Sequence, residues 1–213
     1  MRVLVVAKAP VPGRVKTRLG ARLGMEAAAA LAAAALLDTL AVCRSAFAEC
    51  HLALDGDLGD AVRSDALRRT LAGWTVHRQR GQGLGPRLAH AHADVAGDGP
   101  TVQVGMDTPQ LTTADLNAVA EAASGGDAVL GPATDGGWWV LALSDSSAAA
   151  ALADVPMSRP DTFAATRAAL VAAGQTVRVG HQLTDVDTVD EAWAVAGSLT
   201  GGHFLRAWES VTA

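Results

Sequence analysis

Several features that mark common protein classes are missing from this chain of 213 residues. Its longest apolar run, residues 27–37, is bounded by Glu26 and Asp38 and falls well short of the ~20 residues that a membrane-spanning helix needs. The apolar stretch at residues 3–7 meets Lys8 before it reaches the length of a secretory signal core, ~7 to 15 residues. We therefore expect a cytoplasmic protein with no membrane span.

Cysteine is scarce, and Cys43 and Cys50 lie in what we interpret as the end of one helix. Seven helical residues span ~10 Å, which is beyond the reach of a disulfide, so both thiols are predicted to be free and buried. No CxxC pair, P-loop, GxGxxG or GxSxG motif is present. The sequence thus gives no sign of structural zinc, of the common glycine-rich nucleotide loops or of a serine hydrolase.

Charged residues make up only 18% of the chain, and 17 Lys and Arg against 22 Asp and Glu leave a net charge of -5. This balance argues against a nucleic-acid polymer or an anionic membrane as a partner, so any anion site has to be local. Half of the residues are apolar, and the length predicts one domain over residues 1–213. The oligomeric state stays open.

Short apolar runs rich in β-branched residues alternate with longer segments rich in Ala and Leu, which is typical of an α/β fold. We expect strands at residues 3–7, 51–55, 74–78, 101–105, 128–130, 138–143 and 176–179. Helices are expected at residues 25–48, 59–71, 84–96, 113–123, 147–153, 161–173, 189–199 and 204–209. Helical crossovers predict a single-domain, three-layer α/β/α architecture with a mostly parallel sheet, and ligands of such folds bind beyond the carboxyl ends of the strands.

Positive charge is concentrated at the start of the chain. The first 24 residues contain no acidic side chain, whereas residues 89–158 contain no Lys or Arg. The only two lysines lie in the segment KAPVPGRVKTRLG, which follows the first expected strand. The cations of this segment are Lys8, Arg14, Lys16 and Arg18.

The same segment is expected to form a stiff loop. Prolines exclude helical geometry, and glycine permits a turn that a side chain would obstruct. Such a loop could hold its cations around a polyphosphate, Arg through paired hydrogen bonds and Lys as a point charge. We predict that Lys8, Pro12, Gly13, Arg14, Lys16 and Arg18 form a phosphate site; the alternative is that these cations merely decorate one surface.

Carboxylates follow several of the expected strands. Asp107 comes directly after TVQVG, and Pro109 prevents a helix from starting there, so Asp107 is expected on a short turn. Asp185 and Asp187 lie two apart on one side of an extended segment, where two carboxylates resist joint ionisation unless a cation is near. Asp107 and Asp187 are therefore candidate ligands of Mg²⁺ or Mn²⁺, although each could instead serve a turn or cap a helix.

A glycine-rich turn precedes the strand WWVLAL. Asp135 stands before Gly136 and Gly137, a pair that lets the backbone approach a ligand closely. In a regular strand Trp138 and Trp139 point to opposite faces, so at most one of them is expected to line a pocket.

Taken in order, six segments resemble the bacterial selenodomain-associated transferases of the nucleotide-diphospho-sugar transferase superfamily, over nearly the whole chain. They are KAPVPGRVKTRL, Gln79 with GLGPRL, GMDTPQL, GPATDGGWWVLAL, MSRPDTFAAT and DVDTVDEA. KTRL and DVDTVDEA are also similar to phospholactate guanylyltransferases and molybdenum-cofactor nucleotidylyltransferases. The resemblance implies the GT-A fold.

The resemblance also implies roles for individual residues. Lys16 and Arg18 would contact phosphates, Gly85 would belong to the nucleotide site, and Asp107 with Asp187 would hold the metal. Catalysis would rest on Lys16, Arg18 and Asp107. The acceptor side would be formed by Asp135, Gly136, Gly137 and Trp138.

Two reactions are compatible with these residues: nucleotidyl transfer from a nucleoside triphosphate to a small phosphorylated or acidic acceptor, with release of pyrophosphate, and glycosyl transfer from a nucleotide-diphospho-sugar. The former is preferred, because both ends of the chain look like nucleotidylyltransferases. The chain departs from the resemblance at Gly83, where an acidic residue is usual, so a nucleotide-binding module that has lost its chemistry is a third hypothesis. A structural α/β protein without a small ligand is the fourth.

Overall fold

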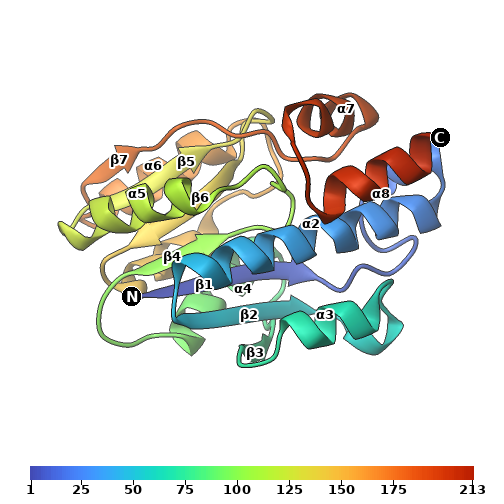
Figure 1. Ribbon diagram of the computed structural model, residues 1–213. Helices are drawn as coiled ribbons and strands as arrows, with labels where there is room; N and C mark the ends of the chain where they lie inside the picture. Colours follow the sequence, from blue (N-terminus) through green and yellow to red (C-terminus); the bar gives the residue numbers. More distant parts are fainter.

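Two layers of helices enclose a seven-stranded β-sheet in the computed structural model, which describes residues 1–213 (Figure 1). The strands are β1 (Arg2–Lys8), β2 (Glu49–Asp55), β3 (Thr75–Arg78), β4 (Thr101–Val104), β5 (Ala128–Pro132), β6 (Trp138–Leu143) and β7 (Val177–Val179). The α-helices are α1 (Thr17–Leu23), α2 (Met25–Ala46), α3 (Ser64–Thr70), α4 (Leu84–Asp94), α5 (Thr113–Ser124), α6 (Thr162–Ala172), α7 (Val189–Ser198) and α8 (His203–Thr212). Two 3₁₀ helices are η1 (Leu58–Asp60) and η2 (Ser146–Asp154). The predicted fold class and all seven predicted strands are confirmed.

The strand order is β3-β2-β1-β4-β6-β5-β7. All neighbouring pairs are parallel except those that involve β6, which runs antiparallel to both β4 and β5. The carboxyl ends of the six parallel strands therefore lie at one edge of the sheet. β6 begins at that same edge, so the turn between β5 and β6 joins the loops that follow the other strands.

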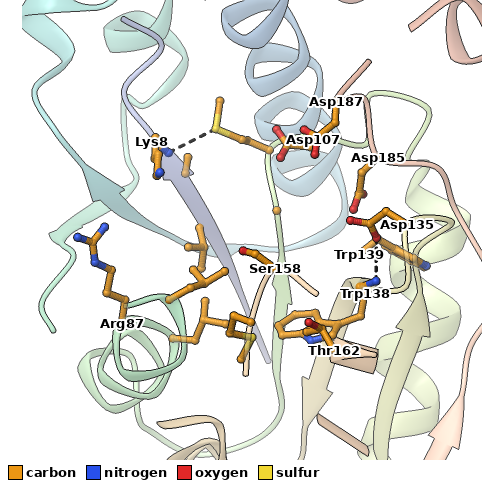
Figure 2. Close-up of a pocket in the computed structure, with 18 of the residues that line it drawn as sticks. Lys8, Arg87, Asp107, Asp135, Trp138, Trp139, Ser158, Thr162, Asp185 and Asp187 are labelled. Atoms are coloured by element: carbon orange, nitrogen blue, oxygen red, sulfur yellow. Dashed lines mark hydrogen bonds between the residues drawn. The ribbon is translucent and has the colours of Figure 1, made fainter. Parts of the chain in front are cut away.

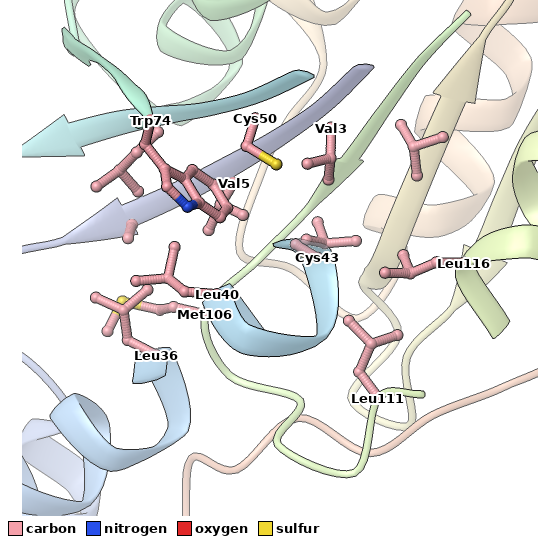
Figure 3. Close-up of a cluster of buried hydrophobic side chains, with 14 of the residues drawn as sticks. Val3, Val5, Leu36, Leu40, Cys43, Cys50, Trp74, Met106, Leu111 and Leu116 are labelled. Carbon is pink, nitrogen blue, oxygen red and sulfur yellow. The ribbon is translucent and has the colours of Figure 1, made fainter. Parts of the chain in front are cut away.

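Alternate residues of the strands point to opposite faces of the sheet and contribute to an apolar layer on each face. On one face, α2, α3 and α5 pack against the sheet, and Leu36 and Leu40 of α2 lie beside Val3 and Val5 of β1 (Figure 3). The opposite face is covered by α4, η2 and α6, with Leu141 at its centre. Both cysteines are buried and free, as predicted, but only Cys43 lies on a helix, because α2 ends at Ala46 and Cys50 is on β2.

Helix α2 is long and apolar enough to cross a membrane by length and composition, with a mean hydropathy of 1.7 over its most apolar window. Of that window, 67% is buried inside the protein, between the sheet on one side and α1 and α8 on the other. Its single internal acid, Asp38, accepts hydrogen bonds from the backbone N–H groups of His203 and Phe204 at 2.8 and 2.7 Å and so caps the start of α8. A central helix of an α/β fold needs this composition, because it is covered on both sides.

Three expectations for the helices were wrong. The segment expected as a loop through Gly20 already contains α1, which begins at Thr17. The helix expected at residues 59–71 is divided into η1 and α3 by an extended residue, Ala61. The helix expected at residues 147–153 is 3₁₀ rather than α, and it packs against α4.

Candidate active site

A cavity of about 660 Å³ opens at the edge of the sheet where the parallel strands end (Figure 2). Its wall combines the end of β1, the loops after β3 and β4, the start of β6 and the segment before α7. Eight of the residues predicted from the sequence lie on this wall: Lys8, Arg14, Lys16, Asp107, Asp135, Gly137, Trp138 and Asp187. The structure thus brings the early cations and the late carboxylates to one cavity.

The loop after β1 is stiffened in the way that its prolines predicted. The backbone N–H of Arg14 donates to the carbonyl of Val11 at 3.0 Å and closes a turn, with Pro12 and Gly13 at the two central positions. Gly13 has a φ of 76°, the value that the second central position of a type II turn requires. Pro12 and Gly13 do not line the cavity, so their predicted role in binding is at most to shape the loop.

Lys16 occupies the centre of the site. Its backbone is left-handed, with φ 47°, and it stands at the N-cap position of α1, where a lysine has no capping side chain. Its side chain is only 8% exposed, and Nζ lies 2.8 Å from Oδ1 of Asp107 and 2.7 Å from Oδ1 of Asp187. The contact with Asp187 has hydrogen-bond geometry. The contact with Asp107 does not, and Asp107 Oδ1 is a buried atom without a hydrogen-bond partner.

The two carboxylate segments are fixed to each other by the backbone. The N–H of Val186 donates to the carbonyl of Asp107 at 2.9 Å, and the Gln110 side-chain amide donates to the carbonyl of Thr184 at 2.7 Å. Val186 is buried, whereas Asp185 and Asp187 on either side of it face the cavity, as the spacing predicted.

Helix α7 does not use Asp187 as its cap. Thr188 takes that position, and its hydroxyl accepts from the backbone N–H of Glu191 in a capping box. Of the two roles that the sequence left open for Asp187, capping is therefore filled by its neighbour, and the carboxylate is free to face Lys16.

The charges in the site perturb one another. Burial alone would lower the pKa of Lys16, but Asp107 and Asp187 outweigh burial and raise this pKa above its usual value. Burial would likewise raise the pKa of Asp187, yet the nearby Lys16 ammonium lowers it. Asp185 forms no ion pair, and burial together with the negative charges of Asp107 and Asp135 outweighs the Lys16 ammonium and raises the pKa of Asp185 to about 7.

The turn before β6 is held from two sides. Asp135 Oδ1 accepts from the backbone N–H of Gly137 at 2.7 Å, which makes an Asx turn. Gly136 has a φ of 90°, and a Cβ at this residue would lie 2.1 Å from the carbonyl oxygen of Pro160. Gly136 therefore lets the loop around Pro160 pack on the turn, but it does not itself line the cavity.

Both tryptophans border the cavity, whereas at most one was expected to do so. Trp138 is partly exposed to the cavity, and its indole N–H donates to the hydroxyl of Thr166 at 3.1 Å. Trp139 is only 2% exposed and belongs to the core on the other face, with its N–H bound to the carbonyl of His181 at 2.9 Å. The expected alternation of the two side chains is present, and the cavity is deep enough to reach both.

Two further predicted residues lie outside the wall. Arg18 is on α1 with its side chain 74% exposed, and its guanidinium reaches Asp187 only at 3.7 Å. Gly85 is buried in the first turn of α4, where a Cβ would lie 2.4 Å from the carbonyl oxygen of Leu152. Gly85 is therefore explained by the close packing of α4 on η2 and not by contact with the cavity.

One protein-family description matches more than half of the chain. Residues 36–159, more than half of the chain, match the family described as "Uncharacterized protein conserved in bacteria (DUF2064)". The chain belongs to the DUF2064 family. Among curated proteins, none matches this DUF2064 member.

Solved structures share the fold of this DUF2064 protein. A protein from Desulfovibrio desulfuricans G20 assigned as a nucleotide-diphospho-sugar transferase is 25% identical, with a TM-score of 0.83 over 99% of this chain and 95% of its own. Rv0371c of Mycobacterium tuberculosis H37Rv, in complex with manganese, is 21% identical, with a TM-score of 0.58 over 93% of this chain and 99% of its own. A CMP:2-keto-3-deoxy-manno-octonic acid synthetase in complex with CTP is 15% identical, with a TM-score of 0.58 over 98% of this chain and 99% of its own. The fold is that of the nucleotide-diphospho-sugar transferases.

The DUF2064 cavity also contains polar residues that the sequence reasoning did not assign. Arg87 of α4 lines it and forms an ion pair with Asp55 at 2.7 Å. Gln103 reaches it from within β4, with its amide oxygen 2.9 Å from the buried ring of His92. Ser158 and others come from the segment MSRPDTFAAT, which carried the family resemblance but no stated role. That segment was the signal that could have found them.

The donor atoms at the centre of the site are of the type that a divalent metal ion prefers, although only two carboxylates, and no group of three or more ligands, converge there. Two carboxylate oxygens, one from Asp107 and one from Asp187, converge on the single point that Lys16 Nζ now faces. Hard oxygen donors of this kind suit Mg²⁺ and Mn²⁺. The buried Oδ1 of Asp107 has the Lys16 ammonium, 2.8 Å away, as its partner, so it would need another cation if that ammonium moved away.

Proposed function

We propose that this DUF2064 protein is a divalent-metal-dependent transferase acting on a nucleotide-activated donor, within the selenodomain-associated group that its motifs resemble. More narrowly, it transfers a nucleotidyl group from a nucleoside triphosphate to a small phosphorylated or acidic acceptor and releases pyrophosphate. The observation that carries this proposal is the meeting of Lys16 with Asp107 and Asp187 on the wall of one 660 Å³ cavity.

The cations of the cavity favour a polyphosphate. Lys8 and Arg14 line the wall and form no ion pair with any carboxylate, so their positive charge is available to a ligand. Lys16, Arg87 and Arg159, each ion-paired with a carboxylate, bring the number of cationic side chains on the wall to five. A triphosphate carries more negative charge than the diphosphate of a sugar nucleotide, so this number of cations favours the triphosphate.

Asp107 and Asp187 are the residues that would hold Mg²⁺ or Mn²⁺. When bound, the metal would neutralise negative charge on the phosphates and on the departing group. The protein's own part is to hold the donor in place with cations and to keep both carboxylates fixed through the backbone bond between Asp107 and Val186.

The acceptor side is proposed at the start of β6. Asp135, Gly137 and Trp138 line this part of the wall, and Figure 2 shows Trp138 near Ser158 and Thr162. An acceptor oxygen placed there would attack the α-phosphorus of the triphosphate, and the bond to the pyrophosphate oxygen would break. Arg159, also on the wall, is ion-paired with Asp161 at 3.0 Å, so an acidic or phosphorylated acceptor would share or replace that carboxylate.

Glycosyl transfer from a nucleotide-diphospho-sugar is the second candidate. It is favoured by the likeness to the Desulfovibrio desulfuricans protein assigned to that class, which extends over 99% of this chain. In this reaction the acceptor attacks a sugar carbon and a nucleoside diphosphate leaves. Gly83 does not distinguish the two reactions. Its φ of 88° is one that glycine adopts more easily than the acidic residue expected there, so the backbone of the loop before α4 accounts for glycine at this position.

Product release distinguishes the candidates. The protein is incubated with Mg²⁺ and acceptor pools, once with the four nucleoside triphosphates and once with nucleotide sugars. Pyrophosphate release supports nucleotidyl transfer, and nucleoside diphosphate release supports glycosyl transfer. Asp107→Asn should abolish either reaction, whereas Asp190→Asn, which removes an exposed carboxylate on α7, should not.

Binding is measured beside turnover. A nucleotide present at 100-fold its dissociation constant should stabilise the folded protein by ~2.7 kcal/mol in a thermal-shift assay. Binding without release of either product across these pools would indicate a module that has lost its chemistry. No stabilisation by any nucleotide with Mg²⁺ would contradict the proposed function altogether.

A further inference from the structure

The ammonium of Lys16 stands where a divalent cation would be held. Nζ is within 2.8 Å of one oxygen from Asp107 and one from Asp187, and the side chain is only 8% exposed. These are the contacts of a counter-ion at the centre of a carboxylate pair. A lysine directed at phosphates would instead leave these oxygens and extend into the open cavity.

Lysine and a metal ion cannot share this position. Magnesium binds oxygens at about 2.0–2.1 Å, so a metal held by the same two oxygens would lie almost on top of Nζ. A divalent ion and an ammonium in contact also repel each other strongly. The two cations are therefore alternative occupants of one site.

The carboxylates near Lys16 explain why a positive charge is needed at its position. Asp135 and Asp185 line the same cavity beside Asp107 and Asp187 (Figure 2), although only Asp107 and Asp187 contact the Lys16 ammonium. Without a cation, several negative charges would face one another in a partly buried place, which is costly. Lys16 supplies the charge in the absence of a metal.

We propose that Lys16 is an internal counter-ion that a divalent metal displaces, and that the displaced ammonium then becomes a ligand of the donor's phosphates. Binding of the metal thereby completes the phosphate site, because it converts a lysine bound to carboxylates into one free for the nucleotide. This inference rests on the proposed function for the identity of the anionic ligand, but the exchange of cations stands on the ion pairs alone.

The chain offers a direct test on the wild-type protein, because Lys8 and Lys16 are its only lysines. Brief acetylation with acetic anhydride, read by peptide mass spectrometry, reports both ε-amines, and exposed Lys8 serves as the internal reference. Without metal, Lys16 should be acetylated at least about tenfold more slowly than Lys8, because its amine is buried and paired. Mg²⁺ should raise the Lys16 rate, and Mg²⁺ with a nucleoside triphosphate should lower it again.

Sodium chloride at matched ionic strength is the control for screening. If the metal only stabilised the fold, the Lys16 rate would fall when Mg²⁺ is added. That outcome, or an unchanged rate at concentrations where the metal is bound, would overturn the proposal.

Metal affinity gives a second and independent readout. Free Mn²⁺ is measured by electron paramagnetic resonance in the absence of nucleotide. Lys16→Met should bind Mn²⁺ about tenfold more tightly than the wild type, the effect of removing about 1.4 kcal/mol of competition. Lys8→Met is the matched control: it removes one positive charge from the same wall, but Lys8 has no carboxylate partner. The Mn²⁺ affinity of this variant should stay within about twofold of that of the wild type.

The outcomes separate this inference from the proposed function. If Lys16→Met does not fold by circular dichroism, the acetylation experiment on the wild type still decides. Metal-dependent exposure of Lys16 without binding of any nucleotide supports the exchange and contradicts the proposed function. Nucleotide turnover with a Lys16 that never responds to metal supports the function and contradicts the exchange.

Discussion

The Asp185→Asn variant should be more stable than the wild type at alkaline pH in metal-free buffer. Burial, followed by the negative charges of Asp107 and Asp135, raises the pKa of Asp185 from 3.8 to about 7. The folded protein therefore binds this proton more tightly than the unfolded chain does. The contribution of Asp185 to stability is fully present below about pH 4 and is lost as the pH rises through about 7.

The magnitude follows from the size of the shift. About three pKa units at 1.36 kcal/mol each correspond to about 4 kcal/mol. Between pH 4 and 7 the free energy of unfolding of the wild type should fall, relative to the variant, by about 1.4 kcal/mol per pH unit. Comparing the two proteins at both ends of this range cancels any effect of the amide on packing.

Urea unfolding with EDTA, followed by tryptophan fluorescence at pH values from about 4 to 8, measures this difference. Asp190→Asn, which removes an exposed carboxylate nearby in the sequence, is the control for loss of charge alone. If the stability curves of the wild type and Asp185→Asn run parallel from pH 4 to 8, the electrostatic description of the site is wrong.

Three further outcomes are expected. Gly136→Ala should lower the free energy of unfolding by about 3 kcal/mol, because φ at this residue is 90° and the added Cβ would lie 2.1 Å from the carbonyl oxygen of Pro160. Gly197→Ala is the control, since a Cβ at that residue would have no atom within 4 Å. Equal urea midpoints for the two variants would contradict the clash. Burial lowers the pKa of His92 to about 4, so the wild type should lose stability as the pH falls from about 6.5 to 4, and His92→Gln should lose less in the same titration. Arg2→Leu should cost about 2 kcal/mol, since the guanidinium of this 4% exposed residue donates to three backbone carbonyls, and an unchanged melting temperature would refute that role.

The strands could be predicted because their residues are local signals. Short apolar runs, several of them rich in β-branched residues, located all seven, and the order of strands and helices predicted the layered fold. Helix α1 was missed because it follows a Pro- and Gly-rich loop, contains Gly20 and has at its N-cap position Lys16, whose side chain does not cap the helix. The Ala-rich η2 reads as an α-helix, and its 3₁₀ form is a product of packing that a local pattern does not contain.

The positions of the candidate site's carboxylates could be predicted from the sequence, but the partners of Lys16 could not. Asp107, Asp135 and Asp187 follow strands, and the strand ends of a parallel sheet meet at one edge, so their gathering on one wall follows from topology. The pairing of Lys16 with Asp107 and Asp187 joins residues far apart in the sequence and depends on how α1 is placed. No spacing rule relates these positions, which is why Lys16 was expected to face phosphates alone.

The reversed direction of β6 has a consequence for divergence among relatives. Because β5 and β6 are antiparallel neighbours, the connection between them is a hairpin and not a helical crossover. Such a connection can change in sequence without moving a crossover helix, provided that Gly136 keeps its packing against Pro160 and its bond to the backbone N–H of Phe163. The end of the cavity proposed to hold the acceptor can therefore vary through the side chains at Asp135 and Gly137, while the end proposed to hold phosphates keeps its geometry.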